Sequence, residues 1–251
     1  MIKIAYQRIA CKLIAVIALA ALSSSCAMLG GEQRQNDEAA ALYQQAMTAR
    51  EDGQLEASLE HLDTLLSDYP NTPQGQRAVL EKAYTHYHLE NYHLTIEQTS
   101  TWLEQGDEAD TRERAYARFL RAEAARALWD ADTSSPPKTS LARQAFAYYR
   151  KVVEYHPESK EVKTTFQRMQ QLRRDLAAEE LRRAREDMNS GDFATAAERA
   201  AWVAEQYRGV RHAADALALQ AEALENLNRD REAEATLRML QILYPDHPAV
   251  E

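Results

Sequence analysis

The chain has 251 residues and a net charge of −9, with 39 acidic against 30 basic side chains. This acidic net charge argues against a nucleic acid partner and against electrostatic binding of the chain to anionic lipid headgroups. Only seven glycines and seven prolines occur, whereas Ala, Leu, Glu and Arg dominate, and these residues lose little side-chain freedom in a helix. No segment alternates in the manner of a strand, so the sequence predicts an all-α protein.

Residues 1–25 have the features of a signal peptide. Lys3, Arg8 and Lys12 make a basic start, and an apolar run follows from Leu13 to Leu22. This run of about 10 residues is too short for a bilayer, which needs roughly 20. We therefore expect the leader to be removed.

Cys26 follows three serines, at the position where a bacterial lipoprotein is cleaved and acylated. We predict N-acyl and S-diacylglycerol groups on Cys26, no further cofactor, and a flexible tether over residues 26–36. Leu22 lies four residues before the cysteine instead of the usual three, so an ordinary secretory signal cleaved near Ser25 is the alternative. That cleavage would leave a free thiol. Cys11 lies inside the leader, so the mature chain cannot form an internal disulfide.

The mature part repeats itself with the spacing of tetratricopeptide (TPR) units, which are helix pairs of about 34 residues. The first unit has small residues at Ala46 and Ser58 and closes with Asp-Tyr-Pro at 68–70, and the last unit closes with Leu-Tyr-Pro at 243–245. The small residues let paired helices approach closely. We predict a right-handed solenoid of five helix pairs, about ten helices, over residues 37–70, 72–106, 110–157, 159–208 and 210–245.

Turn residues, one insertion and one long helix distinguish the individual repeats. Gly53, Gly191 and Asn228 are residue types that adopt the turn conformation ending a first helix. The third repeat holds an insertion, residues 131–140, whose prolines and serines indicate a surface loop. The fourth repeat opens with a long helical run from Ser159 to about Asn189, which we expect to project beyond its partner helix.

The first helix of each repeat lines the curved inner wall of such a solenoid. In the first three repeats this wall is rich in aromatic residues and arginines, which suits an extended peptide with aromatic side chains. The alternative is that each aromatic residue only packs between repeats. The predicted groove residues are Tyr43, Met47, Arg50, Arg77, Leu80, Tyr84, Tyr87, Tyr116, Phe119 and Arg126, with Glu123 on the same wall.

Several segments have a more specific pattern than a generic TPR array. They are 68–70 with Pro73 and Ala78, 119–122, 168–177, 197–200 before Gln206-Tyr207, and Leu240, Ile242 and 244–248. The long fourth-repeat helix is the most specific of them, because generic TPR arrays lack it. Together these segments resemble the BamD family, the TPR lipoproteins of the outer-membrane β-barrel assembly (BAM) complex. Glu198 and Arg208 depart from the family's usual Asn and Pro, and the insertion is shorter than the family's.

The resemblance implies a lipid-anchored scaffold on the periplasmic face of the outer membrane. Its partners would be the POTRA domains of a BamA-like insertase, unfolded β-barrel substrates and further Bam lipoproteins. The N-terminal repeats (37–157) would receive substrate targeting segments, and the C-terminal repeats (158–251) would hold the insertase. Arg199 corresponds to a family arginine at that interface, where its planar fork can pair with a carboxylate.

The sequence offers no catalytic residues and no metal site. His86 and His88 point in different directions on a helix, and His93 follows a turn. The carboxylates Glu179-Glu180 and those of the 107–110 loop are interpreted as solvated faces and loops. No nucleophile has an orienting base beside it. We therefore expect a binding protein and not an enzyme.

Two other classes of periplasm-facing TPR protein remain open. A pilotin, which escorts a type IV pilus secretin, tends to have regular repeats with complete Gly and Pro positions and no long fourth-repeat helix. A peptidoglycan-linked or Tol-associated TPR protein usually adds a coiled coil before the repeats, and residues 27–36 are too short for one. The proteins recovered in a gentle detergent pulldown would distinguish all three classes.

Overall fold

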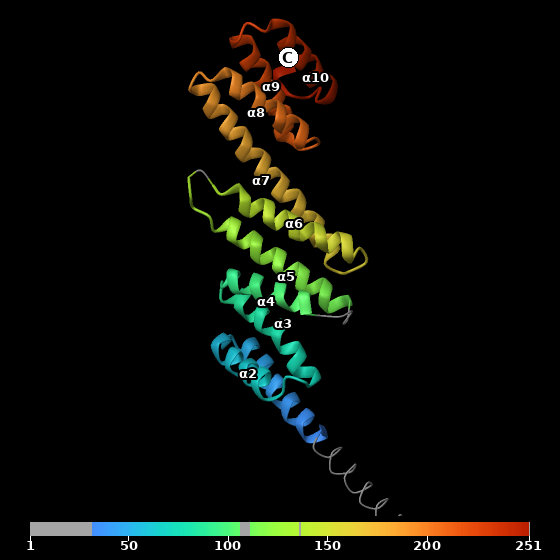
Figure 1. The fold of residues 1–251 in the computed structure, drawn as a ribbon. Coiled ribbons are helices and arrows are strands. Elements are labelled where there is room, and N and C mark those ends of the chain that lie inside the picture. Colours follow the sequence, from blue (N-terminus) through green and yellow to red (C-terminus); the bar gives the residue numbers. More distant parts are fainter. Residues whose placement is uncertain (1–31, 106–110, 136, 251) are drawn as a thin grey trace, which may run out of the picture. The chain divides into compact units, whose positions relative to one another are not determined.

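The computed structural model describes residues 32–105, 111–135 and 137–250, so the leader, Cys26 and the 107–110 carboxylates lie outside the described residues. Within these ranges every regular element is a helix (Figure 1). Residues 32–51 form the first helix. The others are α2 (Leu55–Asp68), α3 (Pro73–His88), α4 (Tyr92–Gln105), α5 (Thr111–Asp130), α6 (Thr139–Tyr155), α7 (Val162–Asn189), α8 (Phe193–Gln206), α9 (Arg211–Asn226), α10 (Asp230–Leu243) and the short 3-10 helix η1 (Pro248–Val250).

The all-α TPR prediction is confirmed, since the ten α-helices form five consecutive pairs at the predicted repeats. The long helix of the fourth repeat, α7, has 28 residues against 14 in its partner α8. It begins at Val162 and not at Ser159, because residues before it form turns in which the Ser159 N–H bonds to the His156 carbonyl at 3.1 Å. Residues 131–135 and 137–138 of the predicted insertion lie between α5 and α6 and are not helical.

Four of the five first helices end in one capping motif. A residue with positive φ follows each of them, and its N–H bonds three residues back while the next N–H bonds five residues back. This is the Schellman arrangement, which satisfies carbonyls left open at a helix end. The positive-φ residues are Gly53, Glu90, Gly191 and Asn228, with φ of 76°, 60°, 82° and 58°. The predicted roles of Gly53, Gly191 and Asn228 are thereby confirmed, and Glu90 was not predicted.

The chain divides into two compact units, Met1–Trp102 and Leu103–Glu251. In the first unit, Ala46 of helix 32–51 and Leu62 and Leu65 of α2 are fully buried in one cluster. In the second unit, α7 packs against α6, α8 and α9. Close approach of α7 to α8 depends on small residues, since Ala184 and Ala196 are both fully buried. Of the described helices, none combines the length and the apolar character needed to cross a membrane.

Candidate functional site

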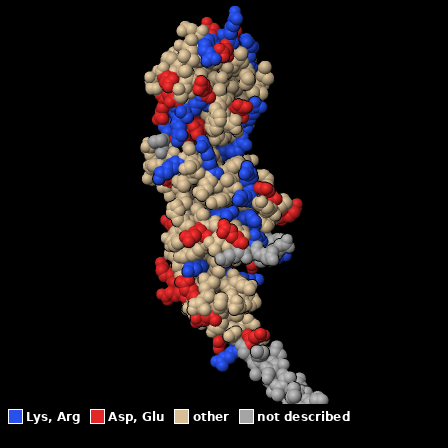
Figure 2. Space-filling view, in the orientation of Figure 1, with Lys and Arg blue, Asp and Glu red and all other residues tan. Residues whose placement is uncertain are grey.

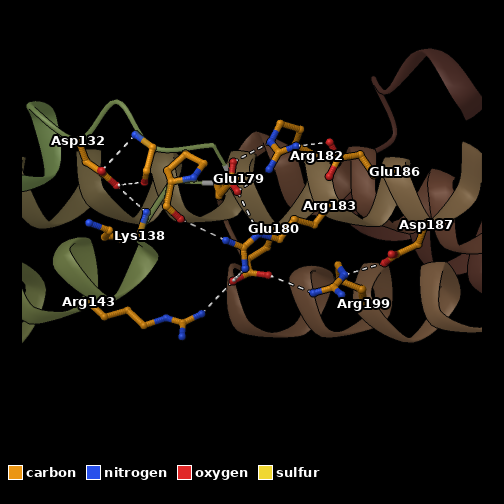
Figure 3. Close-up of polar contacts among 12 residues, drawn as sticks. Asp132, Lys138, Arg143, Glu179, Glu180, Arg182, Arg183, Glu186, Asp187 and Arg199 are labelled. Carbon is orange, nitrogen blue, oxygen red and sulfur yellow. Dashed lines mark hydrogen bonds and ion pairs between the residues drawn. The ribbon is translucent and has the colours of Figure 1, made fainter. Parts of the chain in front are cut away.

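A network of charged side chains joins α6, α7 and α8 in the second unit (Figure 3). At its centre the carboxylate of Glu180 accepts a hydrogen bond from Arg143 Nη2 at 2.8 Å and lies 3.5 Å from Arg199 Nη1. Only 6% of the Glu180 side chain is exposed. A carboxylate so far from water is retained when cations neutralise it and hydrogen bonds satisfy its oxygens.

Arg199 lies in this network, on α8. Its Nε donates to Asp187 Oδ2 at 2.8 Å, near the end of α7. The hydrogen bond from Arg199 to Asp187 raises the pKa of the guanidinium, which therefore stays charged. About a third of the side chain remains exposed. Arg199 thus ties α8 to α7 while part of its side chain reaches the surface.

Glu179, the residue before Glu180 on α7, pairs with two arginines of the same helix. It binds Arg182 Nη2 at 2.7 Å and Arg183 Nε at 3.0 Å, and the hydrogen bond from Arg182 is the main cause that lowers the pKa of Glu179. Arg183 also donates to the carbonyl of Pro137 at 3.3 Å, which ties the segment before α6 to α7. Between α5 and α6, Asp132 accepts hydrogen bonds from Ser134 and from the N–H of Lys138.

The interpretation of Glu179-Glu180 as a solvated face was wrong. Both residues are buried and ion-paired. The physical reason is that α7 is covered on several sides by α6, α8 and α9. Spacing along one helix does not reveal how many of its faces are covered, so the sequence pattern predicts a solvent-exposed face where α7 is in fact covered.

Four of the seven predicted groove residues of the first unit, namely Tyr43, Met47, Arg50 and Tyr84, come together around Glu81, which the sequence analysis did not single out. Glu81 of α3 accepts a hydrogen bond from the Tyr43 hydroxyl at 3.0 Å and pairs with Arg50 Nη1 at 2.5 Å. The guanidinium of Arg50 stacks over the ring of Tyr84, 4.8 Å from its centroid. It also donates to the sulfur of Met47 at 3.1 Å. These side chains form one connected, partly exposed surface.

Two electrostatic consequences follow from this arrangement. Burial and the Glu81 carboxylate raise the pKa of Tyr43 to about 12, so its hydroxyl remains a donor. Burial, and then Arg50, lower the pKa of His88, which contacts the Tyr84 ring edge-on at 4.4 Å between centroids. Of the remaining predicted residues on α3, Arg77 is exposed, Tyr87 is half-buried, and Leu80 is buried in the interior.

The predicted groove residues of the second unit lie on α5. The Phe119 ring packs against Tyr149 of α6 at 6.2 Å between centroids, and Tyr116 is half-buried. Arg126 pairs with Asp130 and lies 3.9 Å from Glu123. Glu123 itself is buried and binds the Tyr149 hydroxyl and Arg168 of α7. This face of α5 is therefore tied to α6 and α7 by polar contacts as well as by packing.

The histidine cluster shows no shared geometry. His86 is buried, whereas His88 and His93 are exposed. Over the ranges that the structure describes, no group of three or more His, Cys, Asp or Glu side chains is arranged to hold a metal ion.

The sequence analysis missed Glu81, Arg143 and Trp202 as candidate site residues. Trp202 of α8 is a large apolar side chain with 40% of its surface exposed. A signal for it existed, because it stands among alanines on the helix that carries Arg199. Arg143 and Glu81 could not be found, since each gains its role from a partner on another helix.

Comparison with known proteins identifies the family. The family model described as YfiO, outer membrane lipoprotein, matches residues 35–239. The outer membrane protein assembly factor BamD of Pasteurella multocida is 23% identical over 218 residues, which cover 84% of this chain and 82% of that protein. BamD of Neisseria meningitidis is 24% identical over 252 residues, covering 94% and 92% respectively.

Several of the solved structures that resemble the chain are described as TPR proteins. The TPR2AB domain of yeast Sti1, in complex with pHSP90, covers 85% of this chain and 80% of its own, with 17% identity and a TM-score of 0.49. TTC0263 of Thermus thermophilus covers 83% and 92%, with 15% identity and a TM-score of 0.40. The family match extends over more than three quarters of the sequence, from within the first helix to within α10. The chain therefore belongs to the YfiO outer membrane lipoprotein family, the family of the outer membrane protein assembly factor BamD.

Proposed function

We propose that the chain is a non-enzymatic scaffold that takes part in the assembly and insertion of β-barrel proteins into the outer membrane. The observation that carries this proposal is the family match over residues 35–239, together with relatives named as outer membrane protein assembly factors. Helix pairs supply stacked surfaces for binding, which is how repeat proteins usually act. The mechanism would be binding alone.

The proposed anchor is a lipid on Cys26, which would hold the chain at the periplasmic face of the outer membrane. Each buried methylene contributes about 0.8 kcal/mol, and two or three acyl chains anchor stably where one does not. Labelling cells with a radioactive fatty acid tests the anchor. We expect label on the wild-type chain and none on Cys26→Ser, and label on the variant would overturn the assignment.

The proposed partner surface lies around Arg199 and would hold the periplasmic POTRA domains of a BamA-like insertase. The support is the partly exposed side chain of Arg199, whose guanidinium is held in place by Asp187 and Glu180. Arg199→Glu should reduce copurification of the insertase at least about tenfold, since charge-assisted pairs are the strong ones and a reversed charge repels a carboxylate. Arg150→Glu, an exposed site on α6, is the matched control. An unchanged yield for Arg199→Glu would exclude this surface.

The proposed substrate surface of the first unit is the connected set of Tyr43, Met47, Arg50 and Tyr84. In the second unit, Tyr116, Phe119 and Arg126 of α5 are proposed separately as a surface for the same targeting segments. A hollow of about 450 Å³ beside Arg50, Tyr84 and His88 offers room for one aromatic side chain of a peptide. A photo-crosslinking residue at position 84 should capture the C-terminal segments of unfolded β-barrel proteins. The same residue at Glu60, exposed on α2, should not. Recovery of a pilus secretin as the main captured protein would favour the pilotin alternative instead.

A further inference from the structure

One face of α5 carries three arginines, Arg114, Arg118 and Arg121, which form an arginine row. They are spaced four and three residues apart, so they lie one above another along the helix. All three side chains are half-buried. Successive residues of a helix turn by about 100°, so Tyr116 and Phe119 of the predicted groove lie on a different face of α5.

Arg118, in the middle of the row, is held by two uncharged groups of α6 and its end. Its Nη1 lies 2.8 Å from His156 Nε2, and its guanidinium stacks over the ring of Tyr155, 4.9 Å from the centroid. Because a guanidinium can only donate, Nε2 of His156 is the acceptor and the imidazole is neutral. Neither contact supplies a negative charge, so Arg118 is fixed in position without being neutralised.

The two flanking arginines are also oriented by uncharged groups. The guanidinium of Arg121 stacks over the Tyr148 ring of α6, 4.4 Å from its centroid. Arg114 Nη2 donates to the carbonyl of Leu103 at 3.0 Å. The row is therefore held in a defined arrangement by aromatic rings and by a backbone carbonyl, and less ordering remains to be done when a ligand binds.

The electrostatics of Arg118 indicate a missing negative charge. Burial, and then the charges of Arg114 and Arg121, lower the pKa of Arg118. The guanidinium nevertheless stays protonated at neutral pH. Arg199 differs in sign, because its carboxylate partner raises its pKa. An anion bound to the row would relieve the mutual repulsion of the three arginines, as carboxylates do elsewhere in this chain.

An exposed aromatic ring borders the row. Tyr155, at the end of α6, has 57% of its surface exposed although Arg118 covers part of the ring. Figure 2 shows Lys and Arg side chains gathered, on the face that it displays, over the part of the second unit where Figure 1 places α5 and α6. Clustered arginine beside an exposed tyrosine is a combination enriched in protein–protein contacts.

The dimensions of the row suit an extended peptide. A helix rises about 1.5 Å per residue, so the row is about 10 Å long. An extended chain advances about 3.3 Å per residue with alternate side chains on one side, so about three residues cover the row. Two acidic side chains separated by one residue would then both face the arginines.

A bilayer surface fits less well. The three guanidinium groups are half-buried and tied to neighbouring residues, so a flat layer of headgroups cannot reach them as a narrow peptide can. The chain as a whole has a net charge of −9, which repels an anionic membrane. A local basic row in an acidic chain instead favours a small anionic ligand that contacts the row alone.

We propose that the arginine row of α5 binds an extended acidic segment of a partner protein, with its carboxylates on Arg114, Arg118 and Arg121 and an apolar side chain against Tyr155. This surface goes beyond the proposed function, since it shares no residue with the Arg199 surface or with the substrate surfaces. His156 is a positioning residue that holds Arg118.

The test measures binding of the full mature chain to a short fluorescent peptide in which glutamate alternates with leucine, by fluorescence polarisation. Arg118→Glu should weaken binding at least about tenfold, because it replaces charge-assisted hydrogen bonds with repulsion. Arg118→Gln removes the charge without reversing it and should weaken binding about fivefold. Tyr155→Ala should weaken it about threefold. Arg150→Glu, exposed elsewhere on α6, should stay within twofold of wild type.

The same peptide with glutamine in place of glutamate should bind at least about tenfold more weakly, and raised salt should weaken binding of the acidic peptide. Equal binding of the two peptides overturns the proposal, as does wild-type affinity in both Arg118 variants. Melting followed by circular dichroism verifies that each variant is folded, and Tyr155→Ala, at an exposed site, tests the surface independently of Arg118.

Vesicles of phosphatidylglycerol and phosphatidylcholine provide the remaining arm. The mature chain with Cys26→Ser, which removes the proposed anchor, should not sediment with them. Sedimentation that Arg118→Glu abolishes would assign the row to anionic lipid and overturn the peptide proposal.

Discussion

The hydroxyl of Tyr149 donates a hydrogen bond to the carboxylate of Glu123 inside the α5–α6 pair. Tyr149 is fully buried, and burial, followed by the Glu123 charge, raises the pKa of its hydroxyl, which therefore stays a donor. Glu123 also lies 3.2 Å from Arg168 Nε on α7. One buried carboxylate thus connects the third helix pair to the long helix of the fourth.

Tyr149→Phe should destabilise the chain by about 1.5–3 kcal/mol, because it leaves a buried charged acceptor short of one hydrogen bond. Urea denaturation followed by circular dichroism measures the change. Tyr148→Phe is the matched control, since its hydroxyl accepts only a 3.2 Å hydrogen bond from Gln144 at the surface. We expect that variant to lie within about 0.5 kcal/mol of wild type. Equal losses in the two variants would show that the buried hydrogen bond contributes no extra stability.

Gly75→Ala should be among the most harmful small substitutions in the first unit. Gly75 is buried in the first turn of α3, and a Cβ there would stand 2.0 Å from the Tyr69 carbonyl oxygen. The clashing atoms belong to the backbone of Tyr69 and Pro70 and cannot rotate away as a side chain would. The start of α3 must therefore move away from this segment. Overpacking of this kind costs about 1–3 kcal/mol or more. A melting temperature equal to that of wild type would contradict the close approach of α3 to this segment.

Glu90→Gly should stabilise the chain, in contrast to most substitutions by glycine. Glu90 has φ of 60° in the turn after α3, a conformation that strains a side-chain-bearing residue. Relief of this strain exceeds the added flexibility of the unfolded chain, so we expect a gain of about 0.5 kcal/mol. Calorimetric melting of the two proteins measures it.

The converse change at the equivalent turn provides the check. Gly53 has φ of 76°, and a Cβ added to it meets nothing within 4 Å. Gly53→Ala therefore isolates the backbone strain without a steric clash, and it should cost about 1 kcal/mol. Opposite signs for the two substitutions are expected, and a loss of stability in Glu90→Gly would show that the turn does not strain Glu90.

Most of the architecture could be predicted because it depends on local signals. Small residues such as Ala46 and Ser58 recur at the spacing that packs two helices, and both are fully buried. Glycine or asparagine marks three of the four Schellman turns. Glu90 escaped prediction because its turn is imposed by the helices on either side and not by a preference of the residue itself.

The candidate site could be predicted only in part because its geometry is created between helices. Arg199 was identified by family resemblance, but its pairing with Asp187 and Glu180 depends on how α8 lies on α7. Glu81 likewise gains its partners from helix 32–51. Periodicity reports which residues share a face of one helix. It does not report which neighbouring helix covers that face, so the sequence predicts solvated residues at Glu179 and Glu180, which are buried in the structure.

Stability of the chain should fall as pH decreases from 7.5 to 5.5, and His86 should account for part of the loss. His86 is buried on α3, and its Nδ1 has no hydrogen-bond partner in the described structure. Burial and then Lys82 lower its pKa from the ordinary 6.5, while Asp63 opposes them weakly. The folded chain therefore binds fewer protons than the unfolded chain in this range. The stabilising contribution is complete above pH 6.5 and is lost as pH falls towards the lowered pKa.

Replacement of the ring by a side chain that does not titrate tests this assignment. His86→Gln should reduce the dependence of the melting temperature on pH between 7.5 and 5.5, whatever its effect at a single pH. The dependence will not vanish, because burial also lowers the pKa of His88 and His156. His93→Gln, at an exposed position after the turn, should leave the slope unchanged. If both variants kept the wild-type slope, protonation of His86 would not be coupled to unfolding, and the loss at low pH would have to come from other groups.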